Sequence, residues 1–328
     1  FSIVDFSFWD SIKNPFQDIC ETRFSESTKR IFLLEKLFDL YNITKILVWV
    51  DVGQEEKECI LVGKQFKIES VMLQHGRFQT SEIWNKFAQF LGQFPAPLLS
   101  DKQIVWGDTT KQYAISHKHI PENLIVGGSP RHDKFFNLID KPKKNGTIVL
   151  ATTGTMFLSG DSCTTNSQIK YDKFIQEIYN VVKSLPNHKL LVKPHPSQII
   201  NKYVRDVIHE IDPTIEIVEN ISNEKLFSSA DLLITFNNST TALESLIVGT
   251  PAISLQTESW ANEDDIANSG AVSCISKISE CESIIKKILH DENFRKSLSI
   301  KRESFLQQYL KNPGTASISI ADILKEGL

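Results

Sequence analysis

The sequence lacks long hydrophobic runs, and no stretch approaches the roughly 20 apolar residues that a transmembrane helix needs. It also lacks a strong excess of either charge, because 36 Lys and Arg against 40 Asp and Glu give a formal net charge of -4. A broadly basic nucleic-acid-binding protein is thereby excluded, whereas a local basic patch is not. With 41% hydrophobic and 23% charged residues, the chain has the composition of an ordinary globular protein.

Cysteine is scarce and scattered. The five cysteines are Cys20, Cys59, Cys163, Cys274 and Cys281. No two of them form a CxxC pair, so neither a disulfide framework nor a zinc site is expected. This favours a reducing, cytoplasmic compartment, with peripheral association at the inner face of the membrane left open. No other group of residues has metal-ligand spacing, and the acidic run 263–265 is of the kind that is usually solvated.

The length of 328 residues exceeds what one hydrophobic core usually organises, so two domains are expected. The chain opens at Phe1 without a methionine, a basic segment or a cleavage site, and we expect more chain to precede it. The stretch 138–146 is rich in Lys, Pro and Gly and is the best candidate for a linker. We therefore expect an N-terminal domain over 1–142 and a C-terminal domain over 143–328, with the tail packing back on the first domain.

Short runs rich in Val, Ile and Leu alternate with helix-length amphipathic segments. The expected strands are residues 44–50, 70–76, 103–107, 123–128, 146–153, 189–195, 215–220, 231–236 and 251–255. Residues 27–42 and 275–291 are among the expected helices, the latter with an apolar face at helical spacing. Continuous apolar strands, each followed by a helix, indicate parallel sheets covered on both faces. The fold class is α/β, as two doubly wound, Rossmann-like domains facing each other across a cleft.

The most informative segment is DLLITFNNSTTALESLIVGTPAISL, residues 231–255. A strand ends in a polar turn, and a helix follows with Gly249 as its C-cap. The turn residues that we expect to hold a phosphate are Asn238, Ser239, Thr240 and Thr241. Such residues cap helices and leave N–H groups and hydroxyls at the positive helix end, where an anion can sit. Glu244 could reach the ribose of a nucleotide, although taken alone it is better read as a surface glutamate.

The segment LVKPHPS, residues 191–197, is the second signal. Its two prolines present His195 rigidly at the carboxyl end of a strand, which suits contact with an anionic group, and Lys193 adds charge. The alternative is a histidine with a structural role. In the turn after strand 146–153, Gly154 permits close approach of a ligand, and Asp161 could act as a base or cap a turn. The spacing matches neither the ATPase phosphate loop nor the dinucleotide fingerprint.

In the first half of the chain, polar residues follow two strands. The apolar part of the expected strand 70–76 is followed by Gln74, His75 and Arg77. In this position His75 could act as a general base, and Arg77 could hold an anion. Ser129 and Arg131, in the sequence GGSPRHD, follow the last strand of this half and would line the same cleft. The alternative is a pair of strand-terminal turns with solvated polar groups.

These motifs resemble those of GT-B glycosyltransferases, and the resemblance extends from about Lys45 to Ile323. It is closest to the surface-polysaccharide group of CDP-glycerol glycerophosphotransferases and CMP-dependent Kdo and sialic-acid-type transferases. His195-Pro196 and Ser239-Thr240-Thr241 are similar to the two motifs that bind the donor's nucleotide and phosphate in that group. His75-Gly76 resembles the pair that carries the acceptor base in the glycerophosphotransferases, although Gln74 stands where those enzymes usually have Trp. The base stays open between His75 and Asp161.

The resemblance implies a metal-independent glycosyltransferase that needs no cofactor. It would move a sugar or polyol phosphate from a nucleotide-activated donor, CMP- or CDP-linked, to a hydroxyl of a surface glycan or polysaccharide. One alternative is a UDP-N-acetylglucosamine 2-epimerase, but this chain has TGTMFLS at 153–159 where that family has a Thr-x-His-Arg-Arg-Glu-Asn segment. Another is a non-catalytic GT-B-like module of a polysaccharide assembly. The sugar, the acceptor and the stereochemical outcome stay open.

Overall fold

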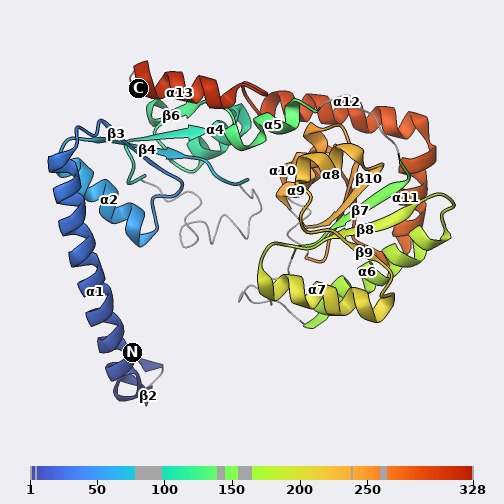
Figure 1. Cartoon of the computed structure of the whole chain (residues 1–328), viewed down its shortest axis with the longest axis horizontal. Coiled ribbons are helices and arrows are strands. Elements are labelled where there is room, and N and C mark those ends of the chain that lie inside the picture. The colour runs from blue at the N-terminus through green and yellow to red at the C-terminus, as the bar shows by residue number, and fades with distance from the viewer. Residues whose placement is uncertain are drawn as a thin grey trace.

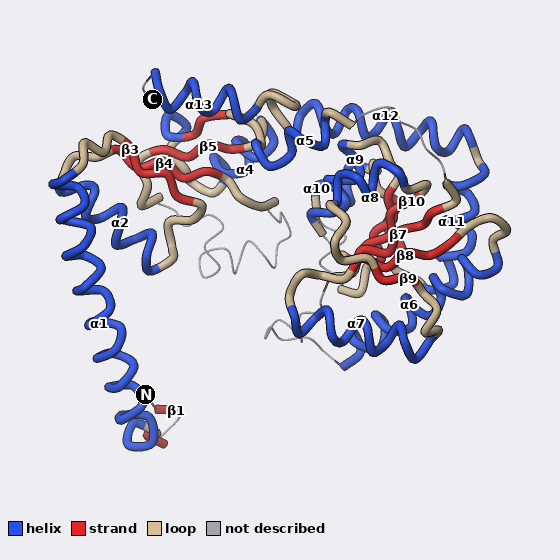
Figure 2. The backbone as a smooth tube through the Cα atoms, in the orientation of Figure 1, coloured by secondary structure: helices blue, strands red, loops and turns tan. Residues whose placement is uncertain are grey.

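The computed structural model describes residues 2–3, 6–77, 98–138, 145–153, 165–237, 239–258 and 264–326. Within them the chain forms two parallel sheets flanked by helices, and a short antiparallel pair near the N-terminus (Figure 1). Figure 2 shows the strands of each sheet in the interior and the helices around them. This arrangement confirms the α/β class.

The sheet in the first half has the order β3-β4-β5-β6, and each of its described strand pairs is parallel. The elements of this half are β1 (Ser2–Ile3), β2 (Phe6–Ser7), α1 (Trp9–Leu40), β3 (Lys45–Val48), α2 (Gln54–Gln65), β4 (Glu69–Leu73), β5 (Lys102–Val105), α4 (Asp108–Ser116), η1 (Pro121–Asn123), β6 (Leu124–Val126), η2 (Pro130–His132) and α5 (Asp133–Phe136).

The second sheet has the order β12-β11-β10-β7-β8-β9 and is parallel throughout its described pairs. The chain runs outward from β7 through β8 and β9, then crosses to β10 and continues outward on the other side. This is the doubly wound order of a Rossmann fold, with its reversal between β7 and β10. The strands and following short elements are β7 (Thr147–Ala151), β8 (Lys189–Lys193), β9 (Glu216–Ile217), β10 (Leu232–Phe236), β11 (Ala252–Leu255), β12 (Ser273–Ile275) and η5 (Ile278–Glu280).

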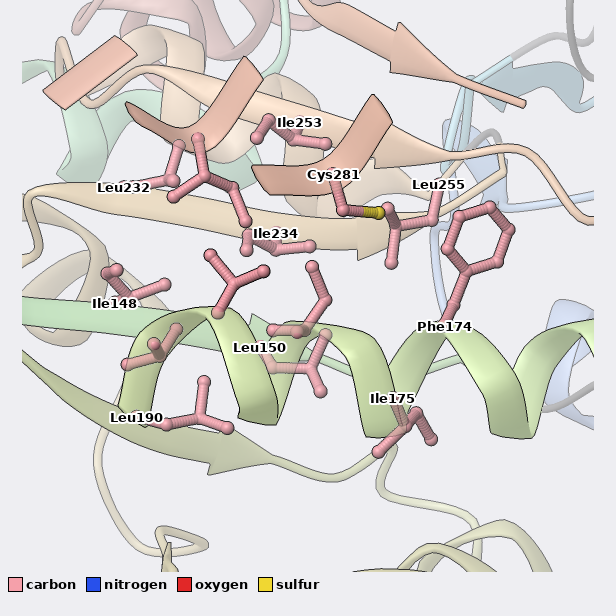
Figure 3. Close-up of a cluster of buried hydrophobic side chains, with 14 of the residues drawn as sticks. Ile148, Leu150, Phe174, Ile175, Leu190, Leu232, Ile234, Ile253, Leu255 and Cys281 are labelled. Carbon is pink, nitrogen blue, oxygen red and sulfur yellow. The ribbon is translucent and has the colours of Figure 1, made fainter. Parts of the chain in front are cut away.

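Helices cover both faces of this sheet. They are α6 (Thr165–Ser184), α7 (Gln198–Ile211), α8 (Asn223–Ser229), α9 (Thr240–Ile247), α10 (Asp265–Ser269), α11 (Cys281–His290) and α12 (Glu292–Tyr309), and the chain continues into α13 (Ala316–Glu326). Every residue of β7 and β10 is buried, which explains why these strands are apolar except at Thr147 and Thr235. Figure 3 shows side chains from one face of these strands gathered with those of α6 and α11 in one core.

Two helix boundaries differ from the sequence prediction. The long helix α1 begins at Trp9 rather than near residue 27, and it contains Pro15. The apolar segment expected to be helical from 275 instead starts in β12, because Ile275 is fully buried beside β11. The helix itself begins at Cys281.

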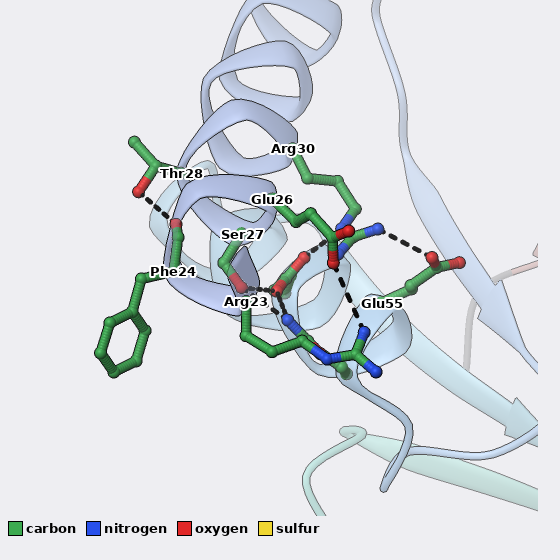
Figure 4. Close-up of polar contacts among 9 residues, drawn as sticks. Arg23, Phe24, Glu26, Ser27, Thr28, Arg30 and Glu55 are labelled. Atoms are coloured by element: carbon green, nitrogen blue, oxygen red, sulfur yellow. Dashed lines mark hydrogen bonds and ion pairs between the residues drawn. The ribbon is translucent and has the colours of Figure 1, made fainter. Parts of the chain in front are cut away.

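Polar contacts join α1 to α2 near the middle of α1, which extends away from the first sheet (Figures 1 and 4). Arg30 Nη1 lies 2.7 Å from Glu55 Oε1, and the Arg30 guanidinium also contacts Glu58. Glu58 is buried and additionally accepts a hydrogen bond from Ser27. These contacts orient α1 on the first domain through charge-assisted hydrogen bonds.

The C-terminal tail passes from the second sheet to the first. Helix α13 lies over the first sheet, where Ile320 packs against Val71, Leu73 and Ile104 (Figure 1). Gly128 has a φ of +95°, and a Cβ there would lie 2.3 Å from the carbonyl oxygen of Lys311. Glycine is needed at this position because of both the left-handed backbone and the close approach of the tail. The expected domain boundary lies in 139–144, outside the described residues, and stays a prediction.

Candidate functional site

The carboxyl ends of the two sheets face each other, and two arginines join them. Arg77, which follows β4, forms an ion pair with Asp264 of the second half, and both side chains are buried, at 3% and 1% exposure. Arg131, which follows β6, places Nη2 3.6 Å from Glu244 Oε1 on α9. The residues that follow the strands of one domain therefore meet those of the other, as expected for a site between two such sheets.

The interpretation of the acidic run 263–265 as solvated is wrong for Asp264. Its carboxylate caps α10, accepting a hydrogen bond from the N–H of Ile266 at 2.9 Å, and pairs with Arg77. Arg77 consequently neutralises a buried carboxylate at the domain interface. In this structure its guanidinium serves the contact between domains, and a role in holding a substrate anion stays a prediction.

The turn after β10 is fixed by Asn237, which sequence reasoning did not single out as a site residue. Asn237 has a left-handed φ of 47°. Its side-chain Oδ1 accepts from the N–H of Thr257 at 2.9 Å, and its Nδ2 donates to Thr257 Oγ1 at 2.9 Å. Asn tolerates this backbone conformation better than most residues, which is the signal that could have identified it. The contacts tie the turn to the loop after β11.

Ser239 is the N-cap of α9, as the sequence predicted for this turn. Its Oγ accepts from the N–H of Thr241 at 3.3 Å and lies 2.8 Å from Thr241 Oγ1. Thr241 Oγ1 is also 3.1 Å from Thr235 Oγ1 on β10, and Thr240 is the first residue of the helix. Three hydroxyls therefore gather at the N-terminal end of α9, where the helix dipole favours an anion. Asn238 lies outside the described residues.

His195 follows β8 and is half-buried, and burial lowers its pKa. The N–H of Ser197 donates to His195 Nδ1 at 3.1 Å, so the proton of the neutral ring is on Nε2. Lys193 instead donates to the backbone carbonyls of Glu219 and Ile221, at 2.5 and 2.9 Å. Burial lowers the pKa of Lys193 as well. The lysine thus secures the loop after β9, while the histidine presents an N–H donor.

His75 is exposed and follows β4. Its Nδ1 lies 3.0 Å from the carbonyl oxygen of Trp49, and its own carbonyl accepts from Arg131 Nη1 at 2.9 Å. A carbonyl can only accept, so Nδ1 carries the proton and the lone pair of the neutral ring is on Nε2. His75 therefore has the tautomer that a general base needs.

The two remaining first-domain candidates are buried and brace the site. Gln74 Oε1 accepts from the N–H of Trp106 at 2.8 Å, and Gln74 Nε2 donates to the carbonyl of Gly76 at 2.9 Å. Ser129 Oγ lies 2.7 Å from His132 Nδ1 inside the domain. These contacts hold the segments that carry His75 and Arg131. That Gln74 and Ser129 line the cleft stays a prediction.

Glu244 is buried, not the surface glutamate of the simpler interpretation. Its Oε2 accepts from Asn223 Nδ2 at 2.8 Å. Burial raises the pKa of Glu244 although Arg131 is close, because Arg131 is half-exposed and its charge is screened. Gly154 and Asp161 lie outside the described residues, so their predicted roles are untouched by this geometry.

Among the described residues, no group of three or more His, Cys, Asp and Glu side chains is arranged to hold a metal ion. None of the described helices combines the length and the apolar character needed to span a bilayer.

A family model described as the LIC12162 family transferase matches residues 13–282, which is most of the chain. The chain belongs to this family. No match was found among curated proteins. The assignment makes the protein a transferase, which supports an enzyme over a purely structural module.

Solved structures share the fold of this LIC12162 family member. UDP-GlcNAc 2-epimerase from Neisseria meningitidis, bound to UDP-GlcNAc, matches with a TM-score of 0.63 and 14% identity, over 92% of this chain and 81% of that one. MnaA of S. aureus with UDP matches with a TM-score of 0.65 and 14% identity, over 92% and 80%. A glycosyltransferase from Rickettsia africae matches with a TM-score of 0.55 and 14% identity, over 91% and 82%. At this identity the similarity shows the fold, and that fold is GT-B-like.

Proposed function

We propose that the protein transfers a sugar or polyol phosphate from a CMP- or CDP-linked donor to a hydroxyl of a surface glycan or polysaccharide. The reaction as proposed needs no metal ion and no cofactor besides the nucleotide-activated donor. The family assignment to transferases supports group transfer. The choice of donor and acceptor rests on the resemblance of the motifs at His195 and Ser239.

The strand order of the second sheet is the main structural support for this proposal. In the second sheet the direction of winding reverses between β7 and β10, and open α/β sheets bind ligands at the carboxyl ends of the strands that flank such a reversal. Ser239 and Thr241 follow β10, and His195 follows β8, the other neighbour of β7. Strands β8 and β10 lie on either side of β7, about 9.6 Å or two strand spacings apart, and a diphosphate with hydrogen bonds at both ends can bridge this distance.

Charge stabilisation in the second domain would assist departure of the nucleotide. The N-terminal end of α9, with the hydroxyls of Ser239 and Thr241, supplies donors to the phosphate oxygens. His195 adds its Nε2–H from the side of β8. Donors fixed in advance stabilise developing negative charge without reorganising, which is a large contribution to catalysis in many enzymes.

The acceptor hydroxyl would enter from the first domain. His75 has its lone pair on Nε2 and is exposed, so it can take the proton of the attacking hydroxyl. Asp161 remains the second candidate for this base. Arg131 links the carbonyl of His75 to Glu244 and thereby couples the base to the donor side of the cleft.

The epimerase alternative is favoured by one observation, the match of the fold over at least 80% of both chains to structures that contain UDP or UDP-GlcNAc. An epimerase would convert UDP-GlcNAc to its C2 epimer without an acceptor. A glycosyltransferase would instead release a nucleotide only as sugar appears on an acceptor.

The decisive experiment is calorimetric titration with CMP, CDP, UDP, UMP, GDP and NAD, followed by NMR of any bound donor in the presence and absence of glycan acceptors. Binding restricted to CMP or CDP supports the proposal. Selective binding of UDP with acceptor-free formation of the C2 epimer would replace it with the epimerase. Selective binding of NAD, or nucleotide binding without any turnover, would contradict a glycosyltransferase.

A further inference from the structure

A groove with a volume of about 830 Å³ lies at the opposite edge of the second sheet from His195 and Ser239. Gly146, Asp231 and Pro251, which line it, immediately precede strands β7, β10 and β11. The groove is therefore at the amino ends of the strands, beside α11 and α12. Nothing in the proposed transfer reaction uses this edge.

Many side chains that line the groove are apolar, and its charged side chains are mostly basic. The apolar lining residues are Ala230, Leu246, Val248, Pro251, Ala271, Ile288, Leu289 and Leu298. The basic side chains of the lining are those of Arg295, Lys296 and Arg302, against one carboxylate, Asp231. Asp231 Oδ2 accepts a hydrogen bond from the N–H of Gly146 at 2.8 Å. Apolar surface next to excess positive charge fits a ligand that is itself amphipathic and negative.

Arg302 is the central basic residue because most of its side chain is buried. It is 19% exposed, and within the described part of the chain its Nε has no hydrogen-bond partner. Its ion pair with Glu303 is long, at 3.5 Å, and the Glu303 side chain is 68% exposed. Because Glu303 is exposed to water and distant, it binds the Arg302 guanidinium only weakly. The guanidinium can therefore bind an anion in the groove.

Arg295 is similarly weakly held. Its Nη1 lies 3.4 Å from the carbonyl of Leu289, and its Nη2 lies 3.9 Å from a Glu292 carboxylate that is 90% exposed. Gly249 makes room for Arg302, since a Cβ at position 249 would lie 2.7 Å from Arg302 Nη1. Its φ of +83° is also a conformation that favours glycine. The backbone thus lets a guanidinium lie close against the groove wall.

We propose that this groove is a binding site for a small, soluble amphipathic anion. The acidic group of the ligand binds Arg295 and Arg302, and its apolar body lies against Leu246, Val248 and Leu298. The site is separate from the nucleotide crevice, so the two ligands do not compete for the same contacts.

Calorimetry of the full chain with hexyl phosphate tests this site, because the probe joins a short apolar chain to one acidic group. Hexyl glucoside has the same chain without the charge, and inorganic phosphate has the charge without the chain. We expect saturable binding of one hexyl phosphate, at least about tenfold weaker binding of each fragment, and no competition from CDP or UDP. Binding as tight for hexyl glucoside, or displacement by a nucleotide, would overturn the proposal.

The variants Arg302→Gln and Arg295→Gln each should weaken hexyl phosphate binding by about tenfold or more, as expected for loss of one charge-assisted contact. Lys286→Gln is the matched control, since it removes one positive charge from the adjacent helix α11 at a residue paired with Glu282. Melting temperatures measured without ligand separate a binding defect from a folding defect. Unchanged affinity in both folded arginine variants contradicts the site, whatever becomes of nucleotide binding.

Discussion

His75 and His195 are held in opposite tautomers by backbone groups on the two sides of the interface between domains. The carbonyl of Trp49 requires a proton on Nδ1 of His75, whereas the N–H of Ser197 requires a lone pair on Nδ1 of His195. The Nε2 atom is consequently an acceptor in His75 and a donor in His195. One ring is suited to take a proton from a hydroxyl, and the other to bind an anion.

His195→Ala should weaken nucleotide binding by about tenfold, because it removes an N–H donor from the phosphate site. His209→Ala is the control, since His209 is exposed on α7. Titration calorimetry with the nucleotide that binds best measures both. If His195→Ala binds as the parent protein does while folding normally, His195 has only a structural role.

His75→Gln should leave nucleotide affinity unchanged and lower the transfer rate by about 10²- to 10⁴-fold, the usual contribution of a general base. Single-turnover kinetics with saturating donor and acceptor separate the two effects. His117→Gln, at the end of α4, serves as the control. Full activity of His75→Gln together with inactivity of Asp161→Asn would assign the base to Asp161.

Ser239→Ala should lower both stability and phosphate binding, because Ser239 caps α9 and contributes a hydroxyl to the site. Loss of an N-cap costs about 1 kcal/mol of unfolding free energy. Asp291→Ala removes the cap of α12, where the carboxylate accepts from the N–H of Phe294 at 2.9 Å. Urea unfolding should find comparable losses, but only Ser239→Ala should weaken nucleotide binding in calorimetry. Equal nucleotide affinity in the two variants would remove Ser239 from the site.

Local rules were sufficient for the central strands of the second sheet and for the N-terminal end of α9. Strands β7 and β10 are apolar except at Thr147 and Thr235, and such runs identify parallel strands without knowledge of the fold. The cap at Ser239 follows equally from its neighbours, because a polar turn between a buried strand and an apolar helix needs one.

Contacts across the domains could not be predicted in this way. Arg77 and Asp264 are 187 positions apart, and their pairing depends on how two complete sheets dock. Charge runs are usually solvated, which is why the sequence predicts an exposed Asp264. Its carboxylate is buried because Arg77 of the other domain pairs with it. Strand β12 was missed for a different reason, since three residues are too few to display a period.

The Arg77–Asp264 pair should show strong coupling in a double-mutant cycle. Arg77→Met leaves a buried carboxylate without its counter-charge and should cost about 3–5 kcal/mol of unfolding free energy. Asp264→Asn keeps an acceptor for the N–H of Ile266, so adding it to Arg77→Met should recover part of the loss. Lys286→Met, which breaks an exposed pair, should cost no more than about 0.5 kcal/mol. Additive costs for the two buried residues in urea unfolding would show that they do not interact.

His132 should make the protein acid-sensitive. Burial, assisted by Arg131 and Lys134, lowers the pKa of His132 to about 3, whereas an unfolded histidine titrates near 6.5. Below about pH 6.5 the unfolded chain binds a proton that the folded chain does not. Each unit by which the pH is lowered therefore reduces the free energy of unfolding by about 1.4 kcal/mol, until the folded pKa is reached. His132→Asn keeps an acceptor beside Ser129 and should reduce this slope between pH 6.5 and 4.5 by about one proton equivalent. An unchanged slope in urea unfolding across this range would show that another group controls acid unfolding.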